Sequence, residues 1–207
     1  MVWISYGLCG LWNGFTFNTV RARRRETKNR AAFAGLSDAK PVNGQRRGAA
    51  ARLPYGRFTM DYNGCEVLAA CNALRLLGRG ASLAETAAWF ERHGLFLEGL
   101  WGTHVLSIPR FFREKGFAPG VHWDGFDAAF GGAGAAVFSF WNSPRLRDGV
   151  HTVALAHGAD GGPVIYNLDT DDSAANTAYR TIGELIERRG ILPILLITLR
   201  EAEHEGI

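Results

Sequence analysis

The chain has 207 residues, of which 47% are apolar, and it carries 23 Lys or Arg against 20 Asp or Glu. A chain of this size buries one substantial core and does not depend on disulfides or a structural metal to fold. Its three cysteines are an odd number without CxxC or Cys/His ligand spacing, which argues against a disulfide framework and a zinc site and favours a reducing, cytoplasmic setting.

The first twenty residues, MVWISYGLCGLWNGFTFNTV, have the apolar character of a signal or membrane segment. Asn13, Thr16 and Asn18 interrupt the stretch, positive charges follow it rather than precede it, and no small-residue cleavage site closes it. We therefore expect a strand or a surface-packing segment here and no membrane span.

A basic arm precedes an acidic body. Residues 1–57 hold 11 Lys or Arg and 2 Asp or Glu, whereas residues 58–207 hold 12 and 18. We assign residues 1–54 to the apolar segment and the arm, and residues 55–207 to one domain. The arm is a partly helical solvated segment, a contact for an acidic partner, or a pro-region that lies across a cleft and is trimmed by the protein itself. The acidic body and the lack of a recognisable nucleic-acid motif argue against nucleic-acid binding.

Three helices are predicted after the arm. Residues 65–77 (CEVLAACNALRLL) have an apolar face at helical spacing and end before Gly78. The second helix follows Ser82, an N-cap with Glu85 three residues later, and runs to Gly94. The third opens at Thr103 and runs to Gly116, with Pro109 in its first turns.

Strands dominate the rest of the chain. The predicted order is a short strand (FAPGVHW), a helical turn (DGFDAAF), strands at 135–141, 149–157 and 163–169, a helix at 181–189 and a closing strand, ILPILLITL. Helices first and an antiparallel sheet afterwards predict the α+β class.

Cys65 is the candidate nucleophile. It follows the tetrapeptide DYNG and opens the first predicted helix, where exposed backbone N–H groups and the positive end of the helix dipole favour a thiolate. Cys71 lies six residues later on the apolar face of the same helix, where we expect inert core.

A thiolate that acts on an amide needs a partner to stabilise it and to protonate the leaving amine, and histidine suits both tasks. Of the six histidines, His151 and His157 lie on one predicted strand, with their side chains on the same face. His151 is the better candidate base, because it lies deeper in the strand while His157 adjoins the turn.

The third member of such a site orients the imidazole. Asn167 and Asp169 lie two residues apart on the returning strand, and pairing across the intervening turn brings both near His151. We prefer Asn167, and a register shift of two residues would exchange it for Asp169.

These features resemble papain-like cysteine peptidases, most of all the bacterial branch that contains the bacteriocin-leader (double-glycine) peptidases. The resemblance spans roughly Tyr55 to Leu199 and rests on the segments NGCEVLAACNALRLLG, GTHVLSIPRFFREKG, AAVFSFWN, HTVALAHG and VIYNLD. It implies a helical half that carries the nucleophile, Cys65, and a sheet half that carries the base, His151, and the orienting residue, Asn167. In the bacteriocin-leader branch that third residue is usually Asp.

The chain departs from the family pattern at two positions. The family places a Gln, which donates to the oxyanion, six residues before the nucleophile, where this chain has Thr59. Asn63 is the first candidate replacement donor, beside the backbone N–H of Cys65, and Tyr62 is the second. Glu66 stands where the relatives have Gly, and a carboxylate beside the thiol raises its pKa unless the side chain turns away.

The sequence therefore predicts a peptidase that cleaves peptide bonds through a Cys65 thioester and needs no metal or organic cofactor. A peptide or protein is the expected substrate, and Trp101, Trp123 and Trp141 are candidates to line its groove. The alternatives are an acyltransferase or peptide ligase with the same residues, and a non-catalytic peptide-recognition domain.

Overall fold

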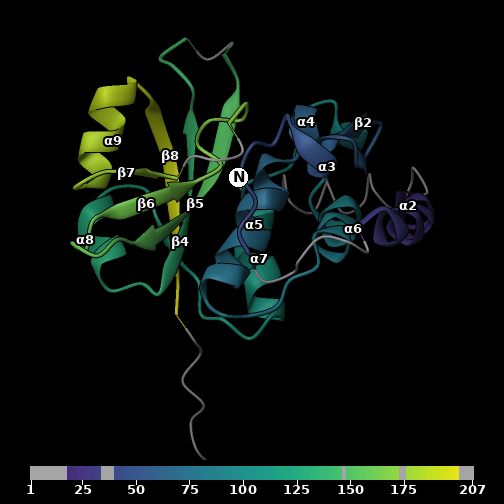
Figure 1. Ribbon diagram of the computed structural model, residues 1–207, viewed down its shortest axis with the longest axis horizontal. Coiled ribbons are helices and arrows are strands. Elements are labelled where there is room, and N and C mark those ends of the chain that lie inside the picture. Colours follow the sequence, from purple (N-terminus) through teal and green to yellow (C-terminus); the bar gives the residue numbers. More distant parts are fainter. Residues whose placement is uncertain (1–17, 34–39, 146–147, 173–175, 201–207) are drawn as a thin grey trace, which may run out of the picture.

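The computed structural model describes residues 18–33, 40–145, 148–172 and 176–200, which form a helical half and a sheet half (Figure 1). The helical half consists of α2 (Asn18–Phe33), α3 (Gly48–Ala51), β1 (Pro54–Tyr55), β2 (Phe58–Thr59), α4 (Met60–Asn63), α5 (Cys65–Leu76), α6 (Leu83–His93), the 3-10 turn η1 (Leu97–Gly99) and α7 (Ser107–Glu114). The sheet half consists of β3 (Gly120–His122), α8 (Phe126–Gly131), β4 (Ala135–Trp141), β5 (Val150–His157), β6 (Pro163–Tyr166), β7 (Thr177–Ala178), α9 (Ile182–Arg189) and β8 (Leu192–Leu199). The predicted α+β class is confirmed. The segment before residue 18 lies outside the described residues.

The main sheet has six antiparallel strands in the order β3-β8-β4-β5-β6-β7, with β4 and β5 at its centre. Figure 1 shows α5 between the sheet and the other helices, while α8 and α9 cover the opposite face. The sheet is therefore the middle of three layers, and both of its faces are buried.

Alternating residues of the central strands build the two cores. Val137 and Ala154 face the helical half and pack in one cluster with Val67 of α5. Phe138 and Leu155, their sequence neighbours, belong to the second cluster beneath α8 and α9. Successive side chains of a strand point to opposite faces, so these apolar runs predict a sheet that is covered on both sides.

Local signals explain where the helices begin. The Ser82 hydroxyl accepts a hydrogen bond from the Glu85 N–H, as the predicted N-cap requires. The third helix was predicted from Thr103 but begins at Ser107, which corrects its start. The reason is Pro109, which has no N–H and is tolerated only in the first helical turn.

The basic arm packs against the body, which corrects its interpretation as a segment outside the core. Ala50 and Leu53, both before the predicted boundary at residue 55, lie in the core cluster of the helical half. Helix α2 packs against α6, and Arg25 forms an ion pair with the buried Glu91, with 2.6 Å between Nε and Oε1. The described part of the arm therefore belongs to the helical half.

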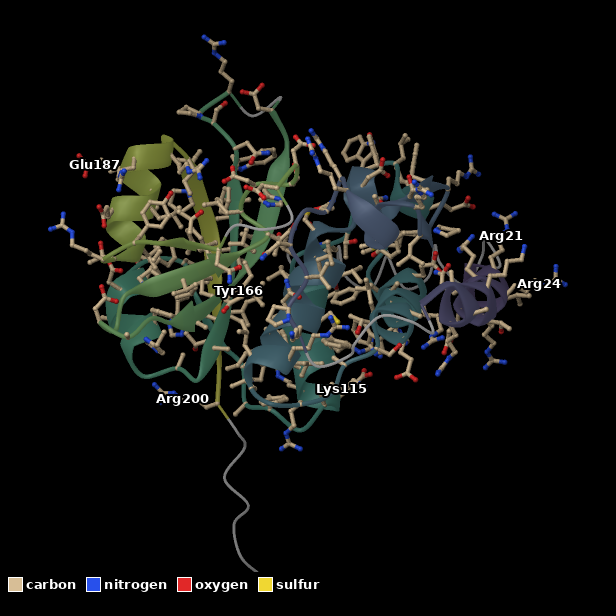
Figure 2. The ribbon with its side chains drawn as sticks, viewed as in Figure 1. Arg21, Arg24, Lys115, Tyr166, Glu187 and Arg200 are labelled. Carbon is tan, nitrogen blue, oxygen red and sulfur yellow. The ribbon has the colours of Figure 1, made fainter. Side chains whose placement is uncertain are left out.

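Glu98 supplies a second anchor for the arm. Its carboxylate accepts hydrogen bonds from Arg21, at 3.2 Å, and from Arg57. Figure 2 shows Arg21 and Arg24 at the α2 end of the molecule, far from the sheet. Part of the arm's positive charge is therefore matched by carboxylates of the body.

Candidate functional site

Cys65 is the first residue of α5 and lies at the interface between the two halves. Gly64 precedes it, and a Cβ atom there would come within 2.5 Å of the Met60 Cε and 2.7 Å of its carbonyl oxygen. The close approach of α4 thus requires glycine at this position and brings the chain directly into α5. The Cys65 side chain is 7% exposed and lines a cleft between the halves.

The Cys65 thiol donates a hydrogen bond to Glu66, with 3.1 Å between Sγ and Oε2. Burial raises the pKa of the Cys65 thiol well above its ordinary value, and the neighbouring Glu66 carboxylate raises it further. Hydrogen bonds from the backbone N–H groups of Thr152 and Glu66 lower the thiol pKa, but by less than burial and the carboxylate raise it. In this arrangement the sulfur keeps its proton, so burial outweighs the helix-dipole effect expected from the sequence.

Glu66 does not turn away from the thiol. Burial raises the pKa of its carboxyl to about 7, although hydrogen bonds from Cys65, from its own N–H and from the Thr152 side chain lower it. Glu66 therefore changes its charge near neutral pH, directly beside the candidate nucleophile.

His151 lies near the start of β5 and lines the same cleft as Cys65. Its Nε2 donates a hydrogen bond to the backbone carbonyl oxygen of Asn167, at 2.7 Å. A carbonyl oxygen can only accept, so in the neutral ring the proton is on Nε2 and Nδ1 is left as an acceptor. Burial lowers the pKa of His151, which favours the neutral ring. The ring also packs edge-on against Phe140.

Asn167 reaches His151 through its main chain rather than its side chain. The predicted strand at 163–169 ends at Tyr166, because Asn167 adopts a left-handed conformation with φ of 64°. Asn tolerates this conformation better than most residues, and the turn aims its carbonyl at the imidazole. Asp169, the alternative third member, forms a two-pronged ion pair with Arg189 at 3.0 and 3.1 Å.

Gln45 is a residue of the site that the sequence reasoning missed. Its backbone N–H donates to the Asn167 Oδ1 at 2.9 Å, and its Oε1 accepts from the Asn167 Nδ2 at 3.3 Å. Its Nε2 donates to the Met60 carbonyl oxygen at 2.8 Å. This buried side chain thus ties the residue that holds His151 to the short helix before Cys65. No sequence signal marks it, because it lies in a segment with the composition of a linker.

The predicted oxyanion donors have other contacts. The Asn63 Nδ2 donates to the Gly99 carbonyl oxygen at 3.0 Å, and its buried Oδ1 has no hydrogen-bond partner among the described residues. Tyr62 is 62% exposed and stacks on Phe58. Thr59, at the position of the family's Gln, donates to the Asp61 carboxylate.

The cleft has a volume of about 1190 Å³ and draws its walls from both halves. It brings Cys65 and His151 together with Asn63, Tyr62 and Asp169, whereas Asn167 lies behind His151 and is fully buried. Within the described ranges, no hydrogen bond joins Cys65 to His151. The cleft is therefore lined by a thiol from the helical half and an imidazole from the sheet half.

The described part of the chain shows neither a metal-binding cluster nor a membrane-spanning helix. It contains no group of three His, Cys, Asp or Glu placed to hold a metal ion. None of its helices is both long enough and apolar enough to cross a membrane. Comparison with known proteins finds no protein family, no curated protein and no solved structure that the chain matches.

Proposed function

We propose that the chain is a cysteine peptidase of papain-like architecture. Cys65 is the nucleophile, His151 is the general base and acid, and a peptide or protein is the substrate. The observation that carries the proposal is that Cys65 and His151 line one cleft from the first residue of α5 and the start of β5. The Nδ1 of His151 has no hydrogen-bond partner among the described residues, and it can serve as the proton acceptor that such chemistry requires.

The reaction begins when the Cys65 thiol leaves Glu66 and transfers its proton to the Nδ1 of His151. The thiolate attacks the peptide carbonyl carbon, and the C–N bond breaks as Nδ1–H returns the proton to the leaving amine. A water molecule then attacks the thioester, giving its proton to Nδ1, and the acid product leaves as the thiol is restored. The Asn167 carbonyl holds Nε2–H throughout and thereby keeps the ring in one tautomer.

The hydrogen bond between the Cys65 thiol and Glu66 favours a second candidate function, that of a non-catalytic peptide-recognition domain. A thiol whose pKa is raised and whose proton is bound by a carboxylate is a poor nucleophile at rest. The peptidase proposal requires that a bound substrate separates the thiol from Glu66, whereas a recognition domain has no such requirement.

Acyl-enzyme detection separates the two candidates. The full chain is incubated with a mixture of fluorogenic peptides and activated esters, and its intact mass is followed beside peptide release. We expect a thioester adduct on Cys65 and turnover, both lost in Cys65→Ala and both retained in Cys71→Ala. Turnover that survives in Cys65→Ala would remove Cys65 from the mechanism. Peptide binding without adduct or turnover would favour the recognition domain.

A further inference from the structure

Exposed apolar side chains gather at the cleft. Among the described residues, the large hydrophobic side chains that are exposed are Val20, Tyr62, Leu100, Trp101, Trp123 and Leu192. Tyr62, Leu100 and Trp101 all line the cleft, with Trp101 73% exposed, and Trp141 faces them from the sheet half. Exposed aromatic residues around a hollow are typical of a surface that a ligand covers.

The charges that line the cleft are mostly negative. Among the described residues, the lining includes Asp61, Asp148, Asp169, Asp171 and Glu66 but a single arginine, Arg46, and no lysine. Arg189 pairs with Asp169, while Arg46 lies 3.8 Å from Asp171, and both members of that second pair are more than 60% exposed. Exposed pairs of this kind are weak, so the walls keep a negative potential that attracts cations.

Asn63 adds an unused acceptor to the lining. Its side chain is 4% exposed, and its Oδ1 has no hydrogen-bond partner in the described part of the chain. The orientation of the amide is set by the Gly99 carbonyl oxygen, which needs a donor and therefore faces the Nδ2. A buried acceptor without a partner among the described residues leaves one hydrogen bond still to be made.

We propose that the cleft selects a peptide segment that carries a Lys or Arg side chain beside an apolar residue; this deepens the peptidase function proposed above. A cation can lie over the rings of Tyr62 and Trp101 within reach of the Asp61 carboxylate. The apolar neighbour packs against Leu100, and an N–H group of the peptide supplies the donor that the Asn63 carbonyl lacks. An acidic peptide would meet repulsion from both walls.

Binding is measured without turnover, on the full-length Cys65→Ala chain. Three labelled peptides share one apolar frame and differ only at a central Arg, Gln or Glu, and fluorescence anisotropy gives each Kd at low and at high salt. We expect the Arg peptide to bind roughly tenfold more tightly than the Glu peptide at low salt, with the gap narrowing as salt rises. Equal affinities, or a preference for Glu, would overturn the proposal, as would a preference that salt does not change.

Matched variants test whether the preference for the Arg peptide arises at the cleft. Trp101→Ala and Asp61→Asn should each weaken binding of the Arg peptide by about three- to tenfold. Trp123, contrary to the sequence-based expectation, does not belong to the cleft lining, and neither does Asp124. Trp123→Ala and Asp124→Asn remove an exposed indole and an exposed carboxylate there, and they should leave the Kd unchanged. Equal losses in both sets would contradict the assignment to the cleft. Arg-selective binding without cleavage by the wild type counts against the peptidase alone, and cleavage of all three peptides at equal rates counts against this inference alone.

Discussion

Helix α5 contains two cysteines and strand β5 contains two histidines, and the two members of each pair have different surroundings. Cys65 lines the cleft and donates to a carboxylate, whereas Cys71 is fully buried and donates to the Ala81 carbonyl oxygen at 3.4 Å. Both thiols belong to cysteines of the same helix. The neighbours of a thiol govern its reactivity, and Cys65 has a titratable partner and access to the cleft, whereas Cys71 is enclosed in the core.

The two histidines of β5 differ in the same way. His151 lines the cleft, and its Nδ1 has no hydrogen-bond partner in the described ranges. His157 has both ring nitrogens within 3.2 Å of carbonyl oxygens and stacks on Phe130 at 4.2 Å. One ring lines the cleft, and the other packs against Phe130 of α8.

Replacement of the two histidines gives the largest expected contrast. His151→Ala should lower kcat/KM for peptide hydrolysis by roughly a hundredfold or more, because it removes the base and acid. His157→Ala should leave kcat/KM nearly unchanged and lower the free energy of unfolding by about 1 kcal/mol through the lost ring contact. Steady-state kinetics and urea unfolding measure the two effects. Equal losses of activity in both variants would contradict the difference drawn between the two ends of β5.

Glu66→Gln tests the control of the thiol pKa by its neighbour. It removes the carboxylate charge but not the burial, which is the larger cause, so the thiol pKa should fall only in part. We expect iodoacetamide to label Cys65 about tenfold faster at pH 7.5, because a lower thiol pKa leaves more thiolate at that pH. Glu187→Gln, on the exposed side of α9 (Figure 2), is the matched control. An unchanged labelling rate in Glu66→Gln would show that Glu66 does not influence the sulfur.

The same carboxyl predicts how stability depends on pH. The pKa of Glu66 is raised from 4.5 to about 7 in the folded state, so the folded chain binds a proton that the unfolded chain has released. This contribution is fully present below pH 4.5 and is lost as the pH rises through 7. Relative to Glu66→Gln, the wild type should lose on the order of 3 kcal/mol of unfolding free energy between pH 4.5 and pH 8. Urea unfolding across this range measures the difference, and parallel pH curves for the two proteins would refute it.

Asn167→Gly should affect catalysis less than His151→Ala, and it separates the role of the Asn167 main chain from that of its side chain. Glycine adopts a φ of 64° without strain, so the carbonyl can still hold His151 while the side-chain bonds to Gln45 are lost. We expect kcat/KM to fall by about tenfold, from a less firmly held ring, and the free energy of unfolding to fall by about 1–2 kcal/mol. If Asn167→Gly were as inactive as His151→Ala, the side chain itself would be required.

Much of the fold could be predicted because its signals are local. The apolar face of α5, the Ser82 cap and the buried runs of β4 and β5 are all visible in short windows, and each occurs in the structure. These elements also bring Cys65 and His151 to one cleft.

The parts that could not be predicted depend on contacts between distant segments. Gln45 lies 122 residues from Asn167, and its role exists only when the arm folds back onto the sheet half. The left-handed turn at Asn167 replaces the last three residues of the predicted strand, and its carbonyl has a partner in His151. The Glu66 carboxyl contacts the Cys65 thiol and also Thr152, which is a residue of the opposite half, so its surroundings are not visible in the local sequence.

We propose that the reactive thiol is that of Cys65, which lines the cleft, and not that of Cys71. The most direct test is alkylation by iodoacetamide between pH 6 and 10, mapped by peptide mass, in a Cys9→Ser background that leaves only the two thiols of α5. We expect label on Cys65 alone, at a rate that rises steeply with pH because the thiol pKa is raised, and we expect Cys71 to stay unlabelled while the chain is folded. Labelling of Cys71 at a similar rate, or a Cys65 that reacts only when the chain unfolds, would contradict it.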